Sequence, residues 1–350
     1  MKAVREIIYF VIFVICIFFT IDFLNRLFTP KWLDPVDNRF GYISKGYFNE
    51  KENSLDVIFM GNSDTYRGIS PMEIWNSYGI TSYNYVSPGQ RMWTGYYMLN
   101  EALETQKPDV IMFNVDGIFS SNHSSLSNYR KVFDTTKLSK NKVDAIMDPV
   151  FNFSFGKKIS LFLPFITYHT RYNELTKEDF EYAYSDYSNP YKGLDLTIDS
   201  KPYEGEYVTS GDKVYKLSDN VLKYLDKFVD KCKKENINLE FIWIPSPDSW
   251  TISKSNAAYE YAKKHNIKFN DLNLIYKEIG IDFETDTADA GDHLNIYGAK
   301  KVSEYLGNYL SKNYSFKKHD KGIIDSWNKD YKDYIKAIED LENSASWYNY

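Results

Sequence analysis

The chain has 350 residues, of which 43% are hydrophobic, enough for the core of one large domain or two small ones. A formal net charge of −6 and the lack of a long basic run argue against nucleic acid as a partner. One of its two cysteines, Cys16, lies in an apolar N-terminal segment, so Cys232 is alone in the rest of the chain. These counts exclude an intradomain disulfide and a cysteine-based zinc site.

An almost continuous apolar run covers residues 7–24. As a helix, these residues would extend about 27 Å, close to the hydrocarbon thickness of a bilayer. We predict a single uncleaved transmembrane anchor, because residues 18–29 contain no small-x-small cleavage site; a cleaved signal peptide is the alternative. Residues 1–6 are then cytoplasmic and the main domain lies outside the cell membrane. Residues 25–54, with two prolines and two glycines, are predicted to be a linker with little regular structure.

The next part of the chain alternates between strand and helix patterns. Short apolar runs predict strands at 56–60, 81–87 and 109–115, with helices at 71–77 and 93–105. After residue 216 the alternation resumes, with helices at 218–234, 255–265 and 297–314 and strands at 239–244 and 267–272. Such alternation implies right-handed crossovers, so we predict an α/β fold: a three-layer parallel sheet flanked by helices, within residues 55–314.

Two stretches interrupt or follow this pattern. Residues 120–216 have patchy apolar content and are predicted to form a helical insertion that covers the carboxyl edge of the sheet and shapes a substrate site. Residues 315–350 are charged, with apolar residues at helical spacing, and predict a helical tail.

Three short motifs occur in an order that suggests a site. Residues 57–68 read VIFMGNSDTYRG, which places Ser63 on a turn directly after a strand. Residues 84–90 read NYVSPGQ, after the second strand, and residues 289–295 read DAGDHLN, before the last helix. Open α/β folds bind ligands at the carboxyl ends of their strands. A lone serine in a turn is usually a cap, and the ordered set is more specific than any one motif.

Acyl transfer by a serine needs a hydroxyl, a base, a carboxylate that orients the base, and donors for the oxyanion. Ser63 supplies the hydroxyl and His293, just before a helix, is the candidate base. Two carboxylates precede this histidine closely in the chain, Asp289 and Asp292. The backbone N–H of Ser63 is one candidate oxyanion donor.

Together the three motifs resemble the SGNH (GDSL-type) hydrolase superfamily over about residues 55–314. The resemblance implies a flavodoxin-like sheet, with the N–H of Gly89 as a second oxyanion donor and Asn114 as a candidate for the third. The superfamily's partner aspartate stands three residues before the histidine, where this chain has Ala290. We therefore favour Asp289, with Asp292 as the alternate.

The anchor, the insertion and the DHLN form of the last motif resemble the membrane-anchored O-acyltransferases of bacterial cell envelopes. This resemblance implies transfer of an acetyl or similar acyl group to a cell-envelope polysaccharide or teichoic-acid-type polymer. It also implies a separate multispanning membrane acyltransferase as the acyl donor. Two alternatives stay open: an extracytoplasmic carbohydrate esterase or deacetylase with the same triad, and an inactive SGNH-fold protein that binds glycan or serves as a scaffold.

Other residues give weaker indications. Arg171, in the insertion, is a candidate for binding an anionic group of the substrate, with a structural ion pair as the alternative. The chain has no glycine-rich phosphate loop and no His, Asp and Glu residues at metal-ligand spacing, so no nucleotide or metal cofactor is predicted.

Overall fold

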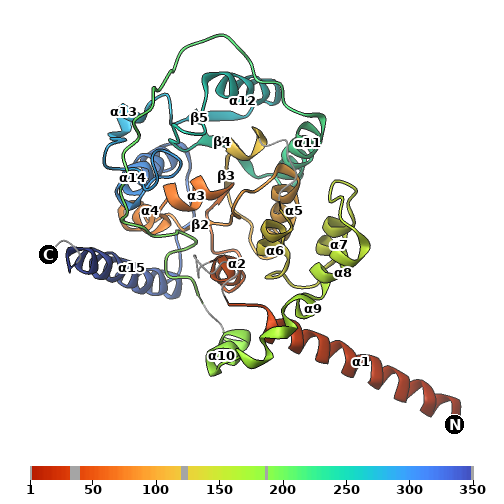
Figure 1. The fold of residues 1–350 in the computed structure, drawn as a ribbon. Helices are drawn as coiled ribbons and strands as arrows, with labels where there is room; N and C mark the ends of the chain where they lie inside the picture. Colours follow the sequence, from red (N-terminus) through yellow and green to blue (C-terminus); the bar gives the residue numbers. More distant parts are fainter. Residues whose placement is uncertain (1, 32–39, 120–124, 186–187, 348–350) are drawn as a thin grey trace.

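The computed structural model describes residues 2–31, 40–119, 125–185 and 188–347. Its centre is a parallel sheet between two layers of helices (Figure 1). The strands are β1 (Val57–Met60), β2 (Ser82–Asn84), β3 (Val110–Asn114), β4 (Asn238–Trp243) and β5 (Lys268–Asp271). Their order, β2-β1-β3-β4-β5 with every pair parallel, is that of flavodoxin-like doubly wound folds. The predicted α/β fold class is confirmed.

Helices cover both faces of the sheet because the central strands β1 and β3 are apolar and buried on both sides. One face packs on α5 (Met92–Ala102), α11 (Asp219–Lys234) and α12 (Ile252–His265), and the other on α4 (Pro71–Tyr78) and α14 (Ile296–Asn313). Successive side chains of β1 alternate between the faces: Ile58 belongs to the first core and Phe59 to the second, and both are fully buried. Burial of a side chain of this size contributes about 1.5–3 kcal/mol.

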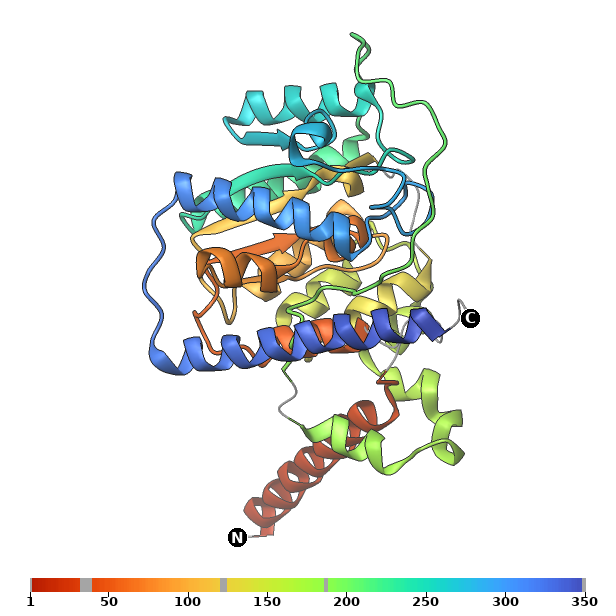
Figure 2. The same ribbon diagram turned by 90° about the vertical axis from the view of Figure 1, so that its left-hand side faces the viewer.

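The remaining elements extend this core. They are α1 (Lys2–Phe28), α2 (Phe40–Phe48), α3 (Ser63–Gly68), η1 (Val115–Phe119), α6 (Leu126–Phe133), α7 (Lys140–Met147), α8 (Phe155–Phe162), α9 (Pro164–Tyr168), η2 (His169–Asn173), α10 (Lys177–Tyr184), α13 (Tyr276–Ile279) and α15 (Lys321–Trp347). Helix α1 projects from the domain (Figure 2) and is long and apolar enough to span a bilayer, as signal sequences also are. Helix α15 packs alongside α4.

The prediction of little regular structure between residues 25 and 54 is wrong where the structure describes that segment. Helix α1 continues to Phe28, and α2 buries Ile43 and Tyr47. The ring of Tyr47 stacks on Tyr85 with centroids 4.2 Å apart. Gly46 of this helix lies close to a neighbouring segment: a Cβ on Gly46 would lie 2.5 Å from Asn189 Cβ. Residues 32–39 of the predicted linker lie outside the described residues.

The insertion of residues 120–216 runs along the carboxyl edge of the sheet in its extended part, and not with its helices as the sequence predicted. Helix α6 begins beside the loop after β2, but α7 packs on α5, while α9 and α10 pack on α1. The extended residues 194–215, here called the crossing segment, run past the carboxyl ends of the strands instead (Figure 1, green). Asp195 N donates to Tyr66 O (2.8 Å) at α3, and Tyr215 N donates to Ser253 O (2.8 Å) at α12. Polar side chains spaced along an extended chain give no helical period, which is why this segment has no clear sequence signal.

Candidate active site

Ser63 stands at the point where β1 turns into α3. The turn is made by Gly61, at φ 150°, where a Cβ would lie 2.5 Å from Thr65 Oγ1 and 2.8 Å from Asn114 Cβ. Asn62 is the N-cap and Ser63 the first residue of α3. Ser63 is half-buried, and among the residues that the structure describes its hydroxyl has no hydrogen-bond partner. The hydroxyl is therefore available to a base or a substrate.

A network of side-chain amides holds this turn. Asn62 donates from Nδ2 to Asp116 Oδ2 (2.6 Å), and Asn114 donates from Nδ2 to Asn62 Oδ1 (3.1 Å). Asn114 Oδ1 in turn accepts from Ile244 N (3.3 Å). Asn114 is fully buried. Its contacts are those of a residue that positions Asn62, and its side chain is not exposed to a substrate as the candidate third donor would be.

His293 lies in the loop before α14 and is held by Asp289. Asp289 Oδ2 is 2.6 Å from His293 Nδ1, and Asp289 Oδ1 accepts from His293 N (2.7 Å). The positive φ angles of Ala290 (62°) and Gly291 (93°) turn the loop so that residues four apart meet. A non-glycine residue at such a φ is uncommon, so the contact depends on local backbone geometry. Asp292 Oδ2 lies 3.4 Å from the same Nδ1.

The two ends of the domain come together at this histidine. His293 Nε2 lies 4.0 Å from Oδ1 of Asp64, the neighbour of Ser63, and α14 contacts α3. No hydrogen bond joins Ser63 Oγ to His293 Nε2 within the described chain. Proton transfer needs about 2.6–3.2 Å between the two atoms, a contact that is often long in unliganded enzymes and tightens with substrate.

The second oxyanion candidate, Gly89, lies on the neighbouring loop. Ser87 N donates to Gly61 O (3.4 Å), which ties this loop to the turn that carries Ser63. Gly89 adopts φ 53°, and a Cβ there would lie 3.0 Å from Asn128 Nδ2 of α6. The loop after β2 and the turn after β1 thus share one edge of the sheet.

Arg171 is not part of this group. Its guanidinium donates to Asp179 Oδ1 (2.9 Å) and to Phe28 O (2.7 Å), and the residue is 8% exposed. These are the contacts of a structural ion pair at the end of α1, the alternative that the sequence left open. The predicted contact of Arg171 with a substrate has no counterpart in this geometry.

The site carries excess acid that changes its pKa values. Burial, with Asp116 and Asp292 nearby, raises the pKa of Asp64 well above its ordinary value. Burial also raises the pKa of Asp116. For His293 burial lowers the pKa, but the Asp289 hydrogen bond and the charges of Asp64 and Asp292 outweigh it, so its pKa is raised. Burial likewise opposes ionisation of Asp289, yet its bond to His293 leaves the pKa of Asp289 lowered.

We expect Asp289→Asn to lower the pKa of His293. The wild-type value should lie above the ordinary 6.5, and the variant loses both the hydrogen bond and the charge that raise it. The measurement is an NMR titration of the full chain with labelled histidine, in which the exposed His169 is the internal control. An unchanged His293 titration in Asp289→Asn would show that the two side chains are not paired in solution.

Three of these residues have a geometry that could hold a metal ion. Asp64, Asp292 and His293 each offer a ligand atom, and the three atoms lie within 4.8 Å of one another. Nitrogen and carboxylate ligands suit Zn²⁺, and the bond from His293 Nδ1 to Asp289 resembles the outer contacts of zinc-bound histidines. The nitrogen nearer to Asp64 is Nε2, so an ion there would occupy the atom that a serine base needs.

Sequence reasoning missed two of the acids near His293. Asp64 was passed over although it adjoins Ser63, and Asp116 although it follows β3. Since the carboxyl ends of parallel strands share one edge, an acid after β1 and an acid after β3 are expected to meet. The order of the strands was therefore a usable signal.

No protein-family model matches the chain, and no curated protein matches it in sequence. Two similar solved structures are a GDSL-like lipase from Bacteroides thetaiotaomicron VPI-5482 and an acetyl xylan esterase. The lipase is 12% identical, with 74% of this chain and 88% of the lipase covered and a TM-score of 0.35. The esterase is 14% identical, with 73% and 98% covered and a TM-score of 0.35. Likeness at this level says nothing about activity, and the fold rests on the strand order given above.

Proposed function

We propose that this protein is a membrane-anchored, serine-dependent O-acyltransferase of SGNH type. It transfers an acyl group, such as acetyl, through an acyl-serine to a hydroxyl of a cell-envelope polysaccharide or teichoic-acid-type polymer. One observation carries the proposal: Asp289 fixes Nδ1 of His293 at 2.6 Å, so that Nε2 is turned to the end of α3 that bears Ser63.

The first half of the reaction forms the acyl-enzyme. Nε2 of His293 takes the proton of Ser63 Oγ as this oxygen attacks the acyl carbonyl carbon. The N–H groups of Ser63 and Gly89 stabilise the oxyanion. The intermediate collapses, the bond to the leaving oxygen breaks, and that oxygen takes the proton from His293.

The second half regenerates the serine. His293 removes the proton of the acceptor hydroxyl, whose oxygen attacks the acyl-serine, and the proton then returns to Ser63 Oγ. Asp289 holds the tautomer with its proton on Nδ1 and stabilises the imidazolium.

The membrane is part of this proposal. Helix α1, as an anchor, would keep the domain beside the bilayer on its outer side, where a separate multispanning acyltransferase could deliver the acyl group. Water in place of the acceptor hydroxyl would make the same site an esterase. The two activities differ only in the acceptor that the site admits.

Labelling by a serine-reactive fluorophosphonate tests the nucleophile. We expect the full chain in detergent to be labelled once, and Ser63→Ala to lose the label, because Ser63 is the serine that His293 is proposed to activate. Ser311→Ala, in the exposed last turn of α14, is the matched control and should keep it. A folded wild-type protein that takes no label would instead support a binding or scaffold function.

Product analysis separates transferase from esterase. The protein is incubated with a soluble acetyl ester and an oligosaccharide acceptor, and acetylated sugar is compared with free acetate. An excess of acetylated sugar supports transfer. Free acetate alone, with Ser63-dependent turnover, supports the esterase.

A further inference from the structure

Exposed apolar side chains gather on the helices around the domain end of α1. We call α8, α9, η2 and α10 (residues 155–184) the collar. Of the fourteen large apolar side chains that are exposed outside α1 in the described chain, five lie on these thirty residues: Phe155, Ile166, Tyr172, Phe180 and Tyr184. Single exposed apolar residues are ordinary, but such a concentration marks a surface that contacts something.

The collar is attached directly to α1. Tyr184 stacks on Phe23 with ring centroids 6.4 Å apart, and Phe165 N donates to Asn25 Oδ1 (3.3 Å). Arg171 donates to the carbonyl of the last residue of α1, which caps the helix. Figures 1 and 2 show α9 and α10 lying beside the end of α1 from which the helix projects. The exposed surfaces of α9, η2 and α10 therefore adjoin that of α1.

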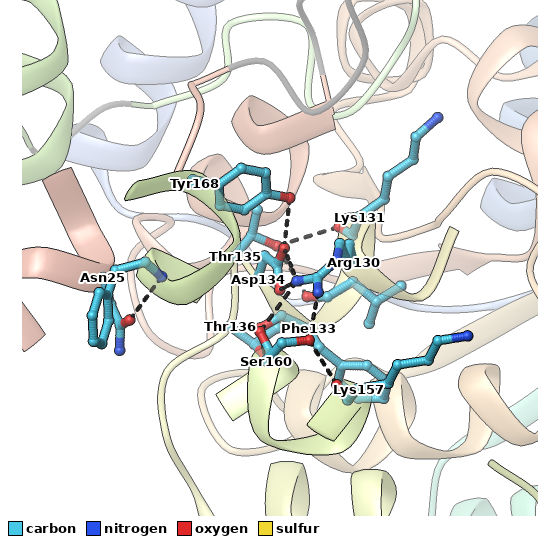
Figure 3. Close-up of polar contacts among 12 residues, drawn as sticks. Asn25, Arg130, Lys131, Phe133, Asp134, Thr135, Thr136, Lys157, Ser160 and Tyr168 are labelled. Atoms are coloured by element: carbon cyan, nitrogen blue, oxygen red, sulfur yellow. Dashed lines mark hydrogen bonds and ion pairs between the residues drawn. The ribbon is translucent and has the colours of Figure 1, made fainter. Parts of the chain in front are cut away.

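A buried polar cluster fixes the collar to the rest of the domain (Figure 3). Asp134, the C-cap of α6, accepts from Tyr168 of α9 (2.8 Å) and pairs with Arg130 (3.2 Å). The other arm of Arg130 donates to Ser160 Oγ of α8 (2.6 Å). One carboxylate and one guanidinium thus join three helices. A movement of the collar that buried its exposed apolar side chains would break these contacts.

The charges of the collar cancel. It has four basic and four acidic residues, and most of them are paired locally. Arg171 pairs with Asp179 (2.9 Å), and Lys177 pairs with Glu181 (2.7 Å). A surface with no net charge gains little from anionic headgroups, so insertion of its aromatic side chains is the main source of attraction.

We propose that the collar lies in the headgroup boundary of the bilayer that α1 enters, so that the domain rests on the membrane in a fixed orientation. This inference rests on α1 being a membrane anchor, as in the proposed function. Tyrosine and phenylalanine are suited to this boundary, where an apolar ring and a polar tip can both be satisfied. The occupant of the surface is lipid itself.

Fluorescence quenching in bilayers tests the collar. The full chain with Cys16→Ser is reconstituted into phosphatidylcholine nanodiscs, one protein per disc, and labelled with NBD at Tyr172→Cys or Phe180→Cys. Burial raises the pKa of Cys232 to about 12, which keeps that thiol unreactive. Doxyl lipids should quench the NBD fluorescence at both collar positions. The NBD emission maximum at these positions should also lie to the blue of that in water. Tyr259→Cys on α12, 57% exposed and at the opposite end of the molecule from α1, is the matched control and should not be quenched.

A third label separates the two possible failures. Phe18→Cys lies within α1 and should be quenched if the helix spans the disc. Quenching of this label with collar labels that behave like Tyr259→Cys overturns the inference and leaves the anchor intact. No quenching of Phe18→Cys overturns the anchor itself. Higher ionic strength should leave the quenching of the collar labels unchanged. Loss of this quenching at high salt would contradict the insertion of aromatic side chains as the main source of attraction to the bilayer.

Discussion

Asp289→Asn is expected to lower kcat for acyl transfer by about 10⁴-fold, as loss of the orienting carboxylate does in serine–histidine–aspartate enzymes. The carboxylate accepts from both the backbone N–H and Nδ1 of His293, at 2.7 and 2.6 Å. An asparagine amide can donate to Nδ1, which would move the ring proton to Nε2. That tautomer cannot accept the proton of Ser63, so the loss falls on kcat.

The matched control is Asp292→Asn, one residue from His293. Asp292 Oδ2 is 3.4 Å from Nδ1, and its charge raises the pKa of His293 from a half-exposed position. Its removal should cost less than about ten-fold in kcat, since one partly solvated charge changes without a change of tautomer. With the pKa of His293 lowered, the acid limb of kcat/KM should move to lower pH. Equal losses in the two variants, or a larger loss in Asp292→Asn, would reverse the assignment.

Most of the sheet could be predicted because its signal is local. Strands β1, β3 and β4 lie in short, mainly apolar runs, and the alternation of strand and helix patterns along the chain implied a parallel sheet. Helix α2 was missed because Gly46 was interpreted as a breaker of structure, whereas it allows the helix to approach Asn189. The path of the crossing segment was missed because it is set by long-range backbone bonds such as Asp195 N to Tyr66 O.

In the candidate site, too, some residues could be predicted from local sequence and others depend on the folded structure. Ser63 and His293 could be selected from sequence because each follows a recognisable motif at a strand or helix boundary. The sequence favoured Asp289 over Asp292 but could not show the contact with His293, since that contact depends on the positive φ of Ala290. Burial, which sets the pKa of Asp64, is likewise a property of the packed fold and leaves no mark on a single motif.

Lys192→Met is expected to lower the free energy of unfolding by about 3–5 kcal/mol, because it removes the cation of a buried ion cluster and leaves two carboxylates without it. Lys192 is 1% exposed, and its Nζ lies 2.7 Å from both Glu50 Oε1 and Asp330 Oδ2. It also lies 4.8 Å from the centroid of the Trp327 ring. These contacts join the end of α2 and the C-terminal helix α15 to the chain that leads into the crossing segment. Methionine keeps an unbranched chain at φ 51°, so the backbone cost is unchanged.

The triple variant Glu50→Gln, Lys192→Met, Asp330→Asn separates the electrostatic part of this loss of stability from the packing part. Removing all three charges should recover most of the loss, because no buried carboxylate is left unpaired. The measurement is urea unfolding of the full chain in detergent, followed by tryptophan fluorescence. Equal midpoints for Lys192→Met and the triple variant would assign the loss to packing.

The pH dependence of the stability of Lys192→Met provides a second, independent test. In the wild type burial raises the pKa of Glu50, while Lys192 opposes that rise. Without the lysine the folded pKa should rise further above the unfolded value, so the variant binds more protons when folded. The loss of unfolding free energy in Lys192→Met, relative to the wild type, should therefore be smallest below the unfolded pKa of glutamate. It should grow as the pH rises through the folded pKa of Glu50. A deficit that does not change with pH would mean that Glu50 finds another cation, or water, once Lys192 is gone.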